Sequence, residues 1–453
     1  MKAWFPFIVL SILTALLVWW SRDFMLFWDT VQFAGKHGLW YYEQGIFSGI
    51  LPEQLDSGHP PFFGMYQAAM WKLFGKSLSV ASFVMLPFLF LNIYFGLRCG
   101  KLILEDRAWL FPLAMLTSPF YLGHSILISP DIILVTGFLM ALYGVLARKR
   151  RFIYAGTILL CLISLRGFAV AAALFLYQAL DLYQQKEKYR NILRKCLSLF
   201  GPAFLLFILY QVFHWTQTRW IGFHDDSPWS GSFGIVDLKT VLRNTLVFGW
   251  RLTDYGMLLV YLIIAYFLLF KKQWADLLSL LLILLMIFGL LIIPFHGLLN
   301  HRYFIPIQLV SMLLILHYLK NYKLLFSALL IAILALGNCV IYPDKIAQGW
   351  DVTAAHWPIY NLEKELSDYL VSDKDLSFSE IGTAFPLRVD RQYLDLVSDT
   401  KGYHKYDMTT DKYILYSNIM NEFSDQDLER LQKWRIIKEL KSGGIRLVLY
   451  SRE

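Results

Sequence analysis

The chain has 453 residues, of which 57% are hydrophobic and only 17% are charged. Soluble domains are about half apolar and about a quarter charged, so this composition excludes an ordinary soluble globular protein. The net charge of +8 could suggest nucleic acid as a partner. The basic residues, however, lie in short segments between apolar runs, as the topology of membrane proteins requires. We therefore expect membrane lipids and no nucleic acid as partners.

Apolar runs of about twenty residues predict membrane-spanning helices. We expect eleven of them, near residues 4–20, 79–97, 108–123, 129–147, 152–165, 167–182, 197–215, 254–270, 275–293, 303–319 and 324–342. The runs that begin near 108, 152 and 167 are short for a bilayer, which favours broken helices there. No small-residue cleavage site precedes Ser21, so we expect the first run to be a membrane helix and not a signal peptide.

Basic residues concentrate in alternate links between these runs, at 98–107, 148–151, 186–195, 271–272 and 320–323. Positive charge marks the cytoplasmic side, so the N-terminus is predicted to be cytoplasmic. The opposite side then receives the loop 21–77, the loop 216–253, the link 295–302 and the tail from 343.

Composition changes after residue 342, where Asp, Lys and Ser become frequent and no membrane-length run follows. Residues 412–417 and 445–451 are rich in β-branched and aromatic side chains, which predicts strands, and 362–371 has the spacing of an amphipathic helix. Ser424 resembles the opening of a capping box for another helix. The sequence therefore predicts a membrane part, 1–342, and a small extracytoplasmic α/β domain, 343–453.

The loop 21–77 contains the first candidate functional groups. Asp29 lies a few residues beyond the first predicted helix, where an ionisable group beside a membrane span is a candidate acid or base. His59 precedes Pro60-Pro61 and a run whose apolar residues recur at helical spacing, as expected for a helix lying in the membrane interface. His59 could contact a phosphate oxygen, and the alternative is a structural histidine in a turn. For Asp29 the alternative is an ordinary surface carboxylate on a solvated loop.

Three further polar positions lie at predicted outer helix ends. Asp131 follows Ser129-Pro130 and could instead be a helix N-cap. Arg166 stands between two apolar runs, where a guanidinium is costly unless it reaches a carboxylate or phosphate; the alternative is a loop residue. Arg302, followed by Tyr303, could clamp a lipid phosphate or extend to the lipid headgroups.

The sequence requires no cofactor. It contains no phosphate-binding glycine loop, dinucleotide fingerprint, zinc-protease motif or cysteine cluster. His224, Asp225 and Asp226 could hold a divalent cation, although a hydrophilic turn explains the same residues.

The order and placement of Asp29, His59-Pro60-Pro61, Ser129-Pro130-Asp131 and Arg302-Tyr303 resemble the GT-C superfamily of integral-membrane glycosyltransferases over roughly residues 1–340. The most similar branch contains protein O-mannosyltransferases, lipid A aminoarabinose transferases and bacterial relatives. The resemblance implies an all-α polytopic membrane protein of a bacterial inner or plasma membrane, with a polyprenyl-phosphate sugar as donor. It also implies that Asp29 is the catalytic base and that His59, Asp131, Arg166, Arg302 and Tyr303 bind donor phosphate or sugar. Many relatives have Glu after the first-loop Asp, where this chain has Thr30.

The chemistry expected of such residues is a single displacement. A polyprenyl phosphate leaves readily, whereas the acceptor hydroxyl of a lipid, glycan or protein needs a base. One carboxylate suffices for inversion of the sugar, and retention would require a second one as nucleophile. The competing hypothesis is a non-enzymatic transporter or flippase that uses Asp29, Asp131 and Arg166 as a path across the membrane.

Overall fold

The computed structural model describes residues 4–222, 224–225, 230–297, 299–343, 352–374, 376–396, 401–419 and 422–452. The part of the chain predicted to lie in the membrane is built mostly from helices. Its helices are α1 (Phe5–Ser21), α2 (His37–Gln44), α3 (Phe62–Phe74), α4 (Leu78–Phe83), α5 (Leu86–Leu104), α6 (Leu110–Thr117), α7 (Pro119–Ser125), α8 (Pro130–Leu146), α9 (Arg150–Ile163), α10 (Leu165–Gln184), α11 (Tyr189–Thr218), α12 (Leu238–Thr253), α13 (Met257–Leu269), α14 (Asp276–Ile292), α15 (Ile305–Leu319) and α16 (Leu324–Leu336).

Four helical stretches of the described chain are long and apolar enough to cross a bilayer: Leu78–Arg107, Leu165–Gln184, Tyr189–Thr218 and His301–Leu319. The pair α12 and α13 could form a fifth span, although it bends by 90° at its break. Shorter apolar helices are Phe5–Ser21, Pro130–Leu146, Asp276–Ile292 and Leu324–Cys339. The chain is thus a mostly helical integral membrane protein, and the count of eleven spans stays a prediction.

Two features of the helices have clear local causes. One is the break predicted for the short run near 108, and the other is a helix inside a predicted loop. The run 108–123 is broken at Ser118, which is extended because Pro119 disfavours a helical conformation in the residue before it. The loop predicted at 216–253 contains the amphipathic helix α12. Asp237 caps this helix by accepting a hydrogen bond of 2.9 Å from the backbone N–H of Thr240.

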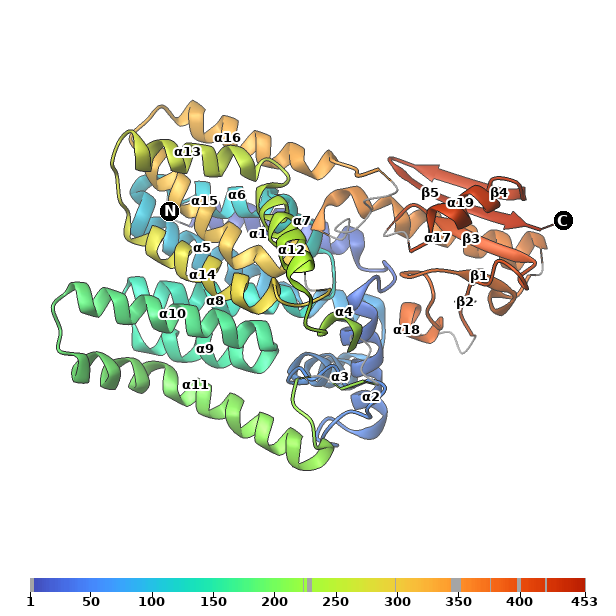
Figure 1. Cartoon of the computed structure of the whole chain (residues 1–453), viewed down its shortest axis with the longest axis horizontal. Helices are drawn as coiled ribbons and strands as arrows, with labels where there is room; N and C mark the ends of the chain where they lie inside the picture. Colours follow the sequence, from blue (N-terminus) through green and yellow to red (C-terminus); the bar gives the residue numbers. More distant parts are fainter. Residues whose placement is uncertain are drawn as a thin grey trace.

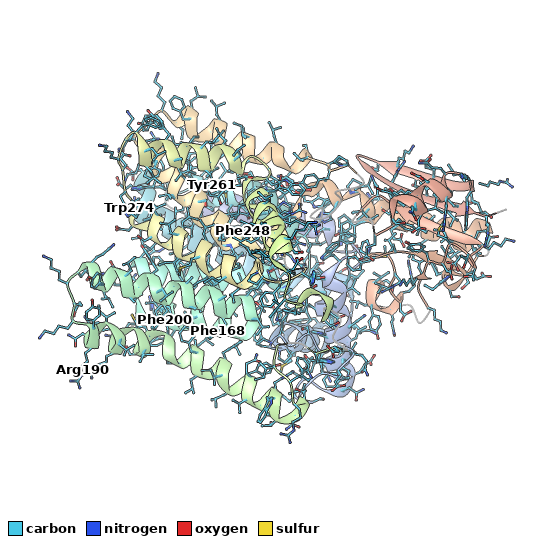
Figure 2. All side chains as sticks on the ribbon, viewed as in Figure 1. Phe168, Arg190, Phe200, Phe248, Tyr261 and Trp274 are labelled. Atoms are coloured by element: carbon cyan, nitrogen blue, oxygen red, sulfur yellow. The ribbon has the colours of Figure 1, made fainter. Side chains whose placement is uncertain are left out.

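Burial separates central helices from those at the margin. Nearly every residue of α8 and α15 is buried, whereas α1, α11, α13 and α16 each expose an apolar face, as lipid contact requires. Aromatic rings pack between α10 and α11. The ring centroids of Phe168 and Phe207 lie 4.5 Å apart, and those of Phe175 and Phe200 lie 5.7 Å apart. Phe168 and Phe200 are labelled in Figure 2. The two most buried helices begin beside the candidate functional residues.

The two ends of the bundle differ. The N-terminus, the basic link between α10 and α11 and the link between α13 and α14 lie at the left end in Figure 1. The helices α2 and α3 and the C-terminal sheet lie at the right end. The pieces predicted to be extracytoplasmic therefore gather at the end opposite these basic links.

The C-terminal region forms a five-stranded sheet in the order β2-β1-β3-β5-β4. Its strands are β1 (Ile381–Thr383), β2 (His404–Lys405), β3 (Tyr413–Ser417), β4 (Arg435–Ser442) and β5 (Ile445–Ser451). The strand β1 pairs in parallel with β2 and β3, whereas β5 pairs antiparallel with β3 and β4. The accompanying helices are α17 (Pro358–Tyr369), α18 (Gln392–Asp395) and α19 (Asp425–Leu431). The strands predicted at 412–417 and 445–451, and the helices predicted near 362 and 424, are confirmed.

This region packs directly on the start of the first outer loop. The backbone N–H of Leu26 donates to the carbonyl of Leu394 at 2.9 Å. Phe27 stacks on His356, with ring centroids 5.6 Å apart, and contacts Tyr360. The C-terminal region thereby fixes the backbone that leads into Asp29.

Candidate functional site

Asp29 lies in a tight turn between α1 and the π-helical segment Val31–Lys36. The Thr30 hydroxyl donates to the carbonyl of Phe27 at 2.6 Å and accepts from the N–H of Phe27 at 2.7 Å. These two bonds close the turn. The Asp29 carboxylate is 14% exposed and forms an ion pair with the guanidinium of Arg302. The first outer loop and a late helix are thus joined at their ionisable groups.

Arg302 and Tyr303 belong to the 3-10 turn His301–Phe304, which leads into α15. The side-chain oxygen of Asn300 caps this turn by accepting from the backbone N–H of Arg302 at 3.3 Å. Arg302 is buried, which its pairing with Asp29 explains better than an extension to lipid headgroups does.

Asp131 and Arg166 form a second ion pair. Their Oδ1 and Nη2 atoms lie 2.7 Å apart, and the Asp131 side chain is only 3% exposed. The N-cap of α8 is Ser129, whose hydroxyl accepts from the N–H of Asp131 at 3.1 Å. The alternative reading of Asp131 as the cap is therefore wrong. The alternative that Arg166 is a loop residue is also wrong, because Arg166 lies in the first turn of α10.

The ring of Tyr303 joins these two pairs. The guanidinium carbon of Arg166 lies 4.5 Å from the ring centroid, and that of Arg302 lies 5.3 Å from it. Arginine close to an aromatic ring is attracted by the ring's negative face. Asp29, Arg302, Tyr303, Arg166 and Asp131 therefore form one continuous set. We call it the outer-end cluster, after the side of the membrane on which it is predicted to lie.

His59 lies at the edge of this cluster. Its Nδ1 accepts from the backbone N–H of Leu165, at the long distance of 3.5 Å, and its ring stacks on Phe33. Burial, with a smaller contribution from the charge of Arg166, lowers the pKa of His59 to about 3. The ring is therefore neutral. Because Nδ1 accepts, the proton is on Nε2, which leaves Nε2–H as a donor.

The outer-end cluster has no net formal charge, because its two guanidinium groups face two carboxylates. An arriving anion must therefore compete with Asp29 or Asp131 for an arginine. The six residues that the resemblance assigns to the base and to donor binding all lie in the outer-end cluster or at its edge. Their partners were not predicted, because the pairs join residues far apart in the chain.

The sequence reasoning missed a second polar cluster at the break between α12 and α13, which we call the elbow cluster. His301 Nε2 lies 2.6 Å from Asp254 Oδ2, the Tyr342 hydroxyl donates to the same carboxylate, and Arg251 Nη1 lies 3.9 Å from it. It adjoins the outer-end cluster through the neighbours His301 and Arg302. The signal available in the sequence was Asp254, a carboxylate at the start of the apolar run 254–270.

Within the described residues, no group of three or more His, Cys, Asp and Glu side chains is arranged to hold a metal ion. The cation hypothesis for His224, Asp225 and Asp226 falls partly outside these residues, because Asp226 is not among them. His224 Nε2 lies 3.3 Å from the carbonyl of Glu53.

No protein-family model matches the chain, and no curated protein matches its sequence. Two solved structures are similar to it over 98% of this chain and 97% of theirs. ArnT from Cupriavidus metallidurans bound to undecaprenyl phosphate shares 12% sequence identity at a TM-score of 0.49. The apo state of ArnT shares 14% at a TM-score of 0.41. With both TM-scores below 0.5, the function has to be inferred from the chain's own residues.

Proposed function

We propose that this chain is a glycosyltransferase that moves a sugar from a polyprenyl-phosphate donor to a hydroxyl group at the outer face of the membrane. The observation that carries the proposal is the outer-end cluster. Two carboxylate–arginine pairs meet there on the ring of Tyr303. A base and two phosphate-binding cations are thus available at the end of the bundle where a lipid-linked sugar would present its head.

Asp29 is the proposed general base. The donor phosphate needs no strong acid to leave, because it is stable as an anion, whereas the acceptor hydroxyl must lose a proton as it attacks. With one carboxylate as base, the sugar is transferred in a single displacement and its anomeric centre is inverted.

Arg302 and Arg166 are the proposed phosphate ligands. A guanidinium binds two phosphate oxygens at once and stabilises the charge that grows on the leaving phosphate. Asp131 orients Arg166 through the 2.7 Å ion pair, and Tyr303 keeps the two guanidinium groups on one ring. His59 would donate from Nε2 to a phosphate or sugar oxygen.

The pairing of Asp29 with Arg302 connects donor binding to catalysis. While Arg302 holds the carboxylate, Asp29 is a poor base, because an adjacent positive charge stabilises its ionised form. A donor phosphate that attracts Arg302 weakens this pair and makes Asp29 more basic. The base would thus become active when the donor is in place.

The proposal is tested with the purified full chain in detergent. Membrane lipid extracts supply candidate donors and acceptors, and mass spectrometry follows the transferred sugar. Asp29→Asn keeps the shape of the side chain but removes the base, so turnover should fall by about 10²–10⁴-fold. Asp23→Asn is the matched control, because Asp23 is an exposed carboxylate near the end of α1. Equal activity of wild type and Asp29→Asn would remove Asp29 from the mechanism. Movement of an intact lipid-linked sugar across vesicles without transfer would favour a flippase instead.

A further inference from the structure

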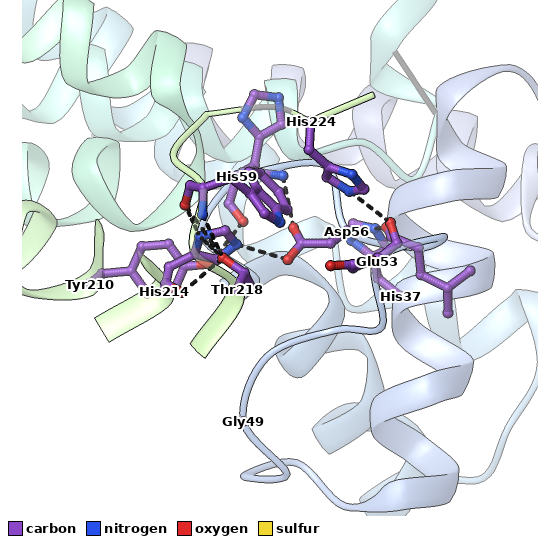
Figure 3. Close-up of polar contacts among 12 residues, drawn as sticks. His37, Gly49, Glu53, Asp56, His59, Tyr210, His214, Thr218 and His224 are labelled. Carbon is purple, nitrogen blue, oxygen red and sulfur yellow. Dashed lines mark hydrogen bonds and ion pairs between the residues drawn. The ribbon is translucent and has the colours of Figure 1, made fainter. Parts of the chain in front are cut away.

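The loop between α2 and α3, residues 45–61, is fixed to the end of α11 by a buried carboxylate–histidine hydrogen bond. We call this segment the His59 loop. Asp56 Oδ2 lies 2.9 Å from His214 Nε2, and the two side chains are 2% and 1% exposed. Figure 3 shows this contact together with His59, which follows Asp56 by three residues. Neither Asp56 nor His214 belongs to the outer-end cluster.

The ring of His214 has partners on both sides. Nε2 lies 2.9 Å from Oδ2 of the Asp56 carboxylate, to which it donates. Nδ1 lies 3.2 Å from both the Trp220 carbonyl and the Thr218 hydroxyl. These contacts fix the orientation of the imidazole, so that Nε2 faces Asp56.

Asp56 also shapes the turn that leads to His59. Its other oxygen, Oδ1, accepts from the backbone N–H of Gly58 at 2.8 Å. Gly58 has a positive φ of 70° and lies so close to Gly222 that a Cβ would stand 1.8 Å from the Gly222 carbonyl oxygen. One carboxylate therefore connects the end of α11 to the turn before His59.

Two more contacts hold the same short segment. The Tyr210 hydroxyl, on α11, donates to the carbonyl of His59 at 3.3 Å. On the other side, His37 Nε2 lies 2.6 Å from the carbonyl of Leu55. By contrast, the bond between the His59 ring and Leu165 is long, at 3.5 Å. The position of the His59 ring therefore depends on how its loop is held.

We infer that Asp56 and His214 are a positioning pair for the transfer reaction. They fix the His59 loop so that the Nε2–H of His59 faces the phosphate or sugar of the donor beside Arg166. This inference rests on the proposed function for the role of His59, but the fixing of the loop can be tested without any substrate. A binding group displaced by about 1 Å can cost up to about a hundredfold in rate.

The decisive experiment is a double-mutant cycle in the full-length protein. Asp56→Asn keeps an oxygen for the Gly58 N–H but places an amide N–H₂, which cannot accept a hydrogen bond, against Nε2 of His214. We expect it to lower kcat about tenfold or more in the wild-type background. In the His59→Ala background the same change should cost less than about twofold, because two residues that act through one contact are not additive. Equal losses in both backgrounds, or a wild-type rate for His59→Ala, would overturn the inference.

A second measurement separates positioning from unfolding. Hydrogen exchange of the amides 57–59 should rise in Asp56→Asn and in His214→Gln, while exchange in α8 and α15 stays slow. His404→Gln is the matched control, because His404 and Asp411 form a pair of the same type at 2.9 Å in the C-terminal region. It should alter neither exchange in the His59 loop nor kcat.

The two hypotheses fail in different ways. If wild-type protein transfers no sugar, the proposed function fails, and the exchange measurement alone decides whether the pair holds the loop. If transfer is observed but Asp56→Asn leaves exchange at 57–59 unchanged, the positioning pair is refuted and the proposed function stands.

Discussion

In the free protein, Asp29, the proposed base, is paired with Arg302, a proposed phosphate ligand. Asp29 and Arg302 form an ion pair in which both side chains are largely shielded from water. Removing one member of such a pair leaves the other with an uncompensated charge. Substitutions at the two positions should therefore have opposite effects on donor binding.

Arg302→Ala should weaken binding of a short-chain polyprenyl phosphate about tenfold or more, because a charge-assisted hydrogen bond is lost. Arg302→Lys keeps the charge without the planar fork and should restore binding only in part. Asp29→Asn frees Arg302 from its ion pair. This variant should therefore bind the phosphate at least as tightly as wild type, although its turnover is low. Titration of the three purified variants measures this. Weaker binding by Asp29→Asn would show that Arg302 does not serve the phosphate.

Individual residues could be predicted where they stand out from their surroundings. Arg166 and Arg302 are charged groups at the ends of apolar runs, and such groups are costly without a role. Asp56 and His214 gave no comparable signal. Asp56 lies among polar loop residues, and His214 lies at the end of a predicted span, so only the folded contact of 2.9 Å reveals them.

Among the secondary-structure elements, the pair α12 and α13 determines how the outer end is closed. Asn244 on α12 donates to the carbonyls of Ile293 and Phe295, at 2.9 and 2.8 Å, just beyond the end of α14. The last carbonyls of a helix lack partners within the helix, so this side chain satisfies groups that would otherwise be unpaired. The elbow cluster lies at the C-terminal end of α12, where α13 follows.

Asn244→Ala should therefore destabilise the protein by about 1–3 kcal/mol, the cost of leaving a buried polar group without a partner. Thermal unfolding in detergent, followed by intrinsic fluorescence, measures the change. Thr245→Ala is a suitable control, because Thr245 is exposed on the same helix and bonds only within α12 among the described contacts. An equally small effect of both substitutions would exclude this role for Asn244.

Apolar runs predicted the helices well because length and periodicity are local properties of the sequence. The break at Ser118 also had a local cause, in Pro119. The strands β1 and β2 could not be predicted, because they have three and two residues and exist only through their neighbours. The edge strand β4, with the sequence RIIKELKS, mixes charged and apolar residues without alternation, and most of its side chains are exposed. It therefore lacked the period-two pattern of a half-buried strand.

On the scale of the whole molecule, the C-terminal region and the first outer loop share one buried interface. Glu363 on α17 is 3% exposed, lies 3.4 Å from Arg391 and accepts from the Tyr403 hydroxyl at 3.3 Å. It also lines a small cavity of about 20 Å³ against Met25, Leu26 and Phe27. Burial raises the pKa of Glu363 to about 7 from its usual 4.5, although Arg391 and Tyr403 oppose the shift.

A raised pKa means that the folded state binds this proton more tightly than the unfolded state does. The contribution of Glu363 to stability is therefore highest below pH 4.5 and falls as the pH rises towards 7. The loss amounts to about 3 kcal/mol, at 1.36 kcal/mol per pKa unit. Glu363→Gln has no carboxyl group to titrate at this position. As the pH rises from 5 to 8, the free energy of unfolding should therefore fall less in Glu363→Gln than in wild type. Parallel pH profiles of the melting temperature for the two proteins would contradict the assignment.

The arrangement of the whole chain makes a prediction about its orientation. The helices α2 and α3, which flank the His59 loop, and the C-terminal sheet lie at one end of the bundle, and the basic links that follow α10 and α13 lie at the other (Figure 1). The outer-end cluster belongs to the first of these ends, because Asp29 precedes α2 and His59 bonds to Leu165 beside Arg166. Positive links remain cytoplasmic during insertion, so the end that carries the cluster should face away from the cytoplasm. A reporter fused after Glu453 should then be extracytoplasmic, and one inserted at Lys149 cytoplasmic. Reporters that fluoresce or gain enzyme activity on only one side of the membrane distinguish the two locations. A cytoplasmic C-terminus would place the proposed base and phosphate ligands on the inner face, and the acceptor would then have to be a cytoplasmic hydroxyl.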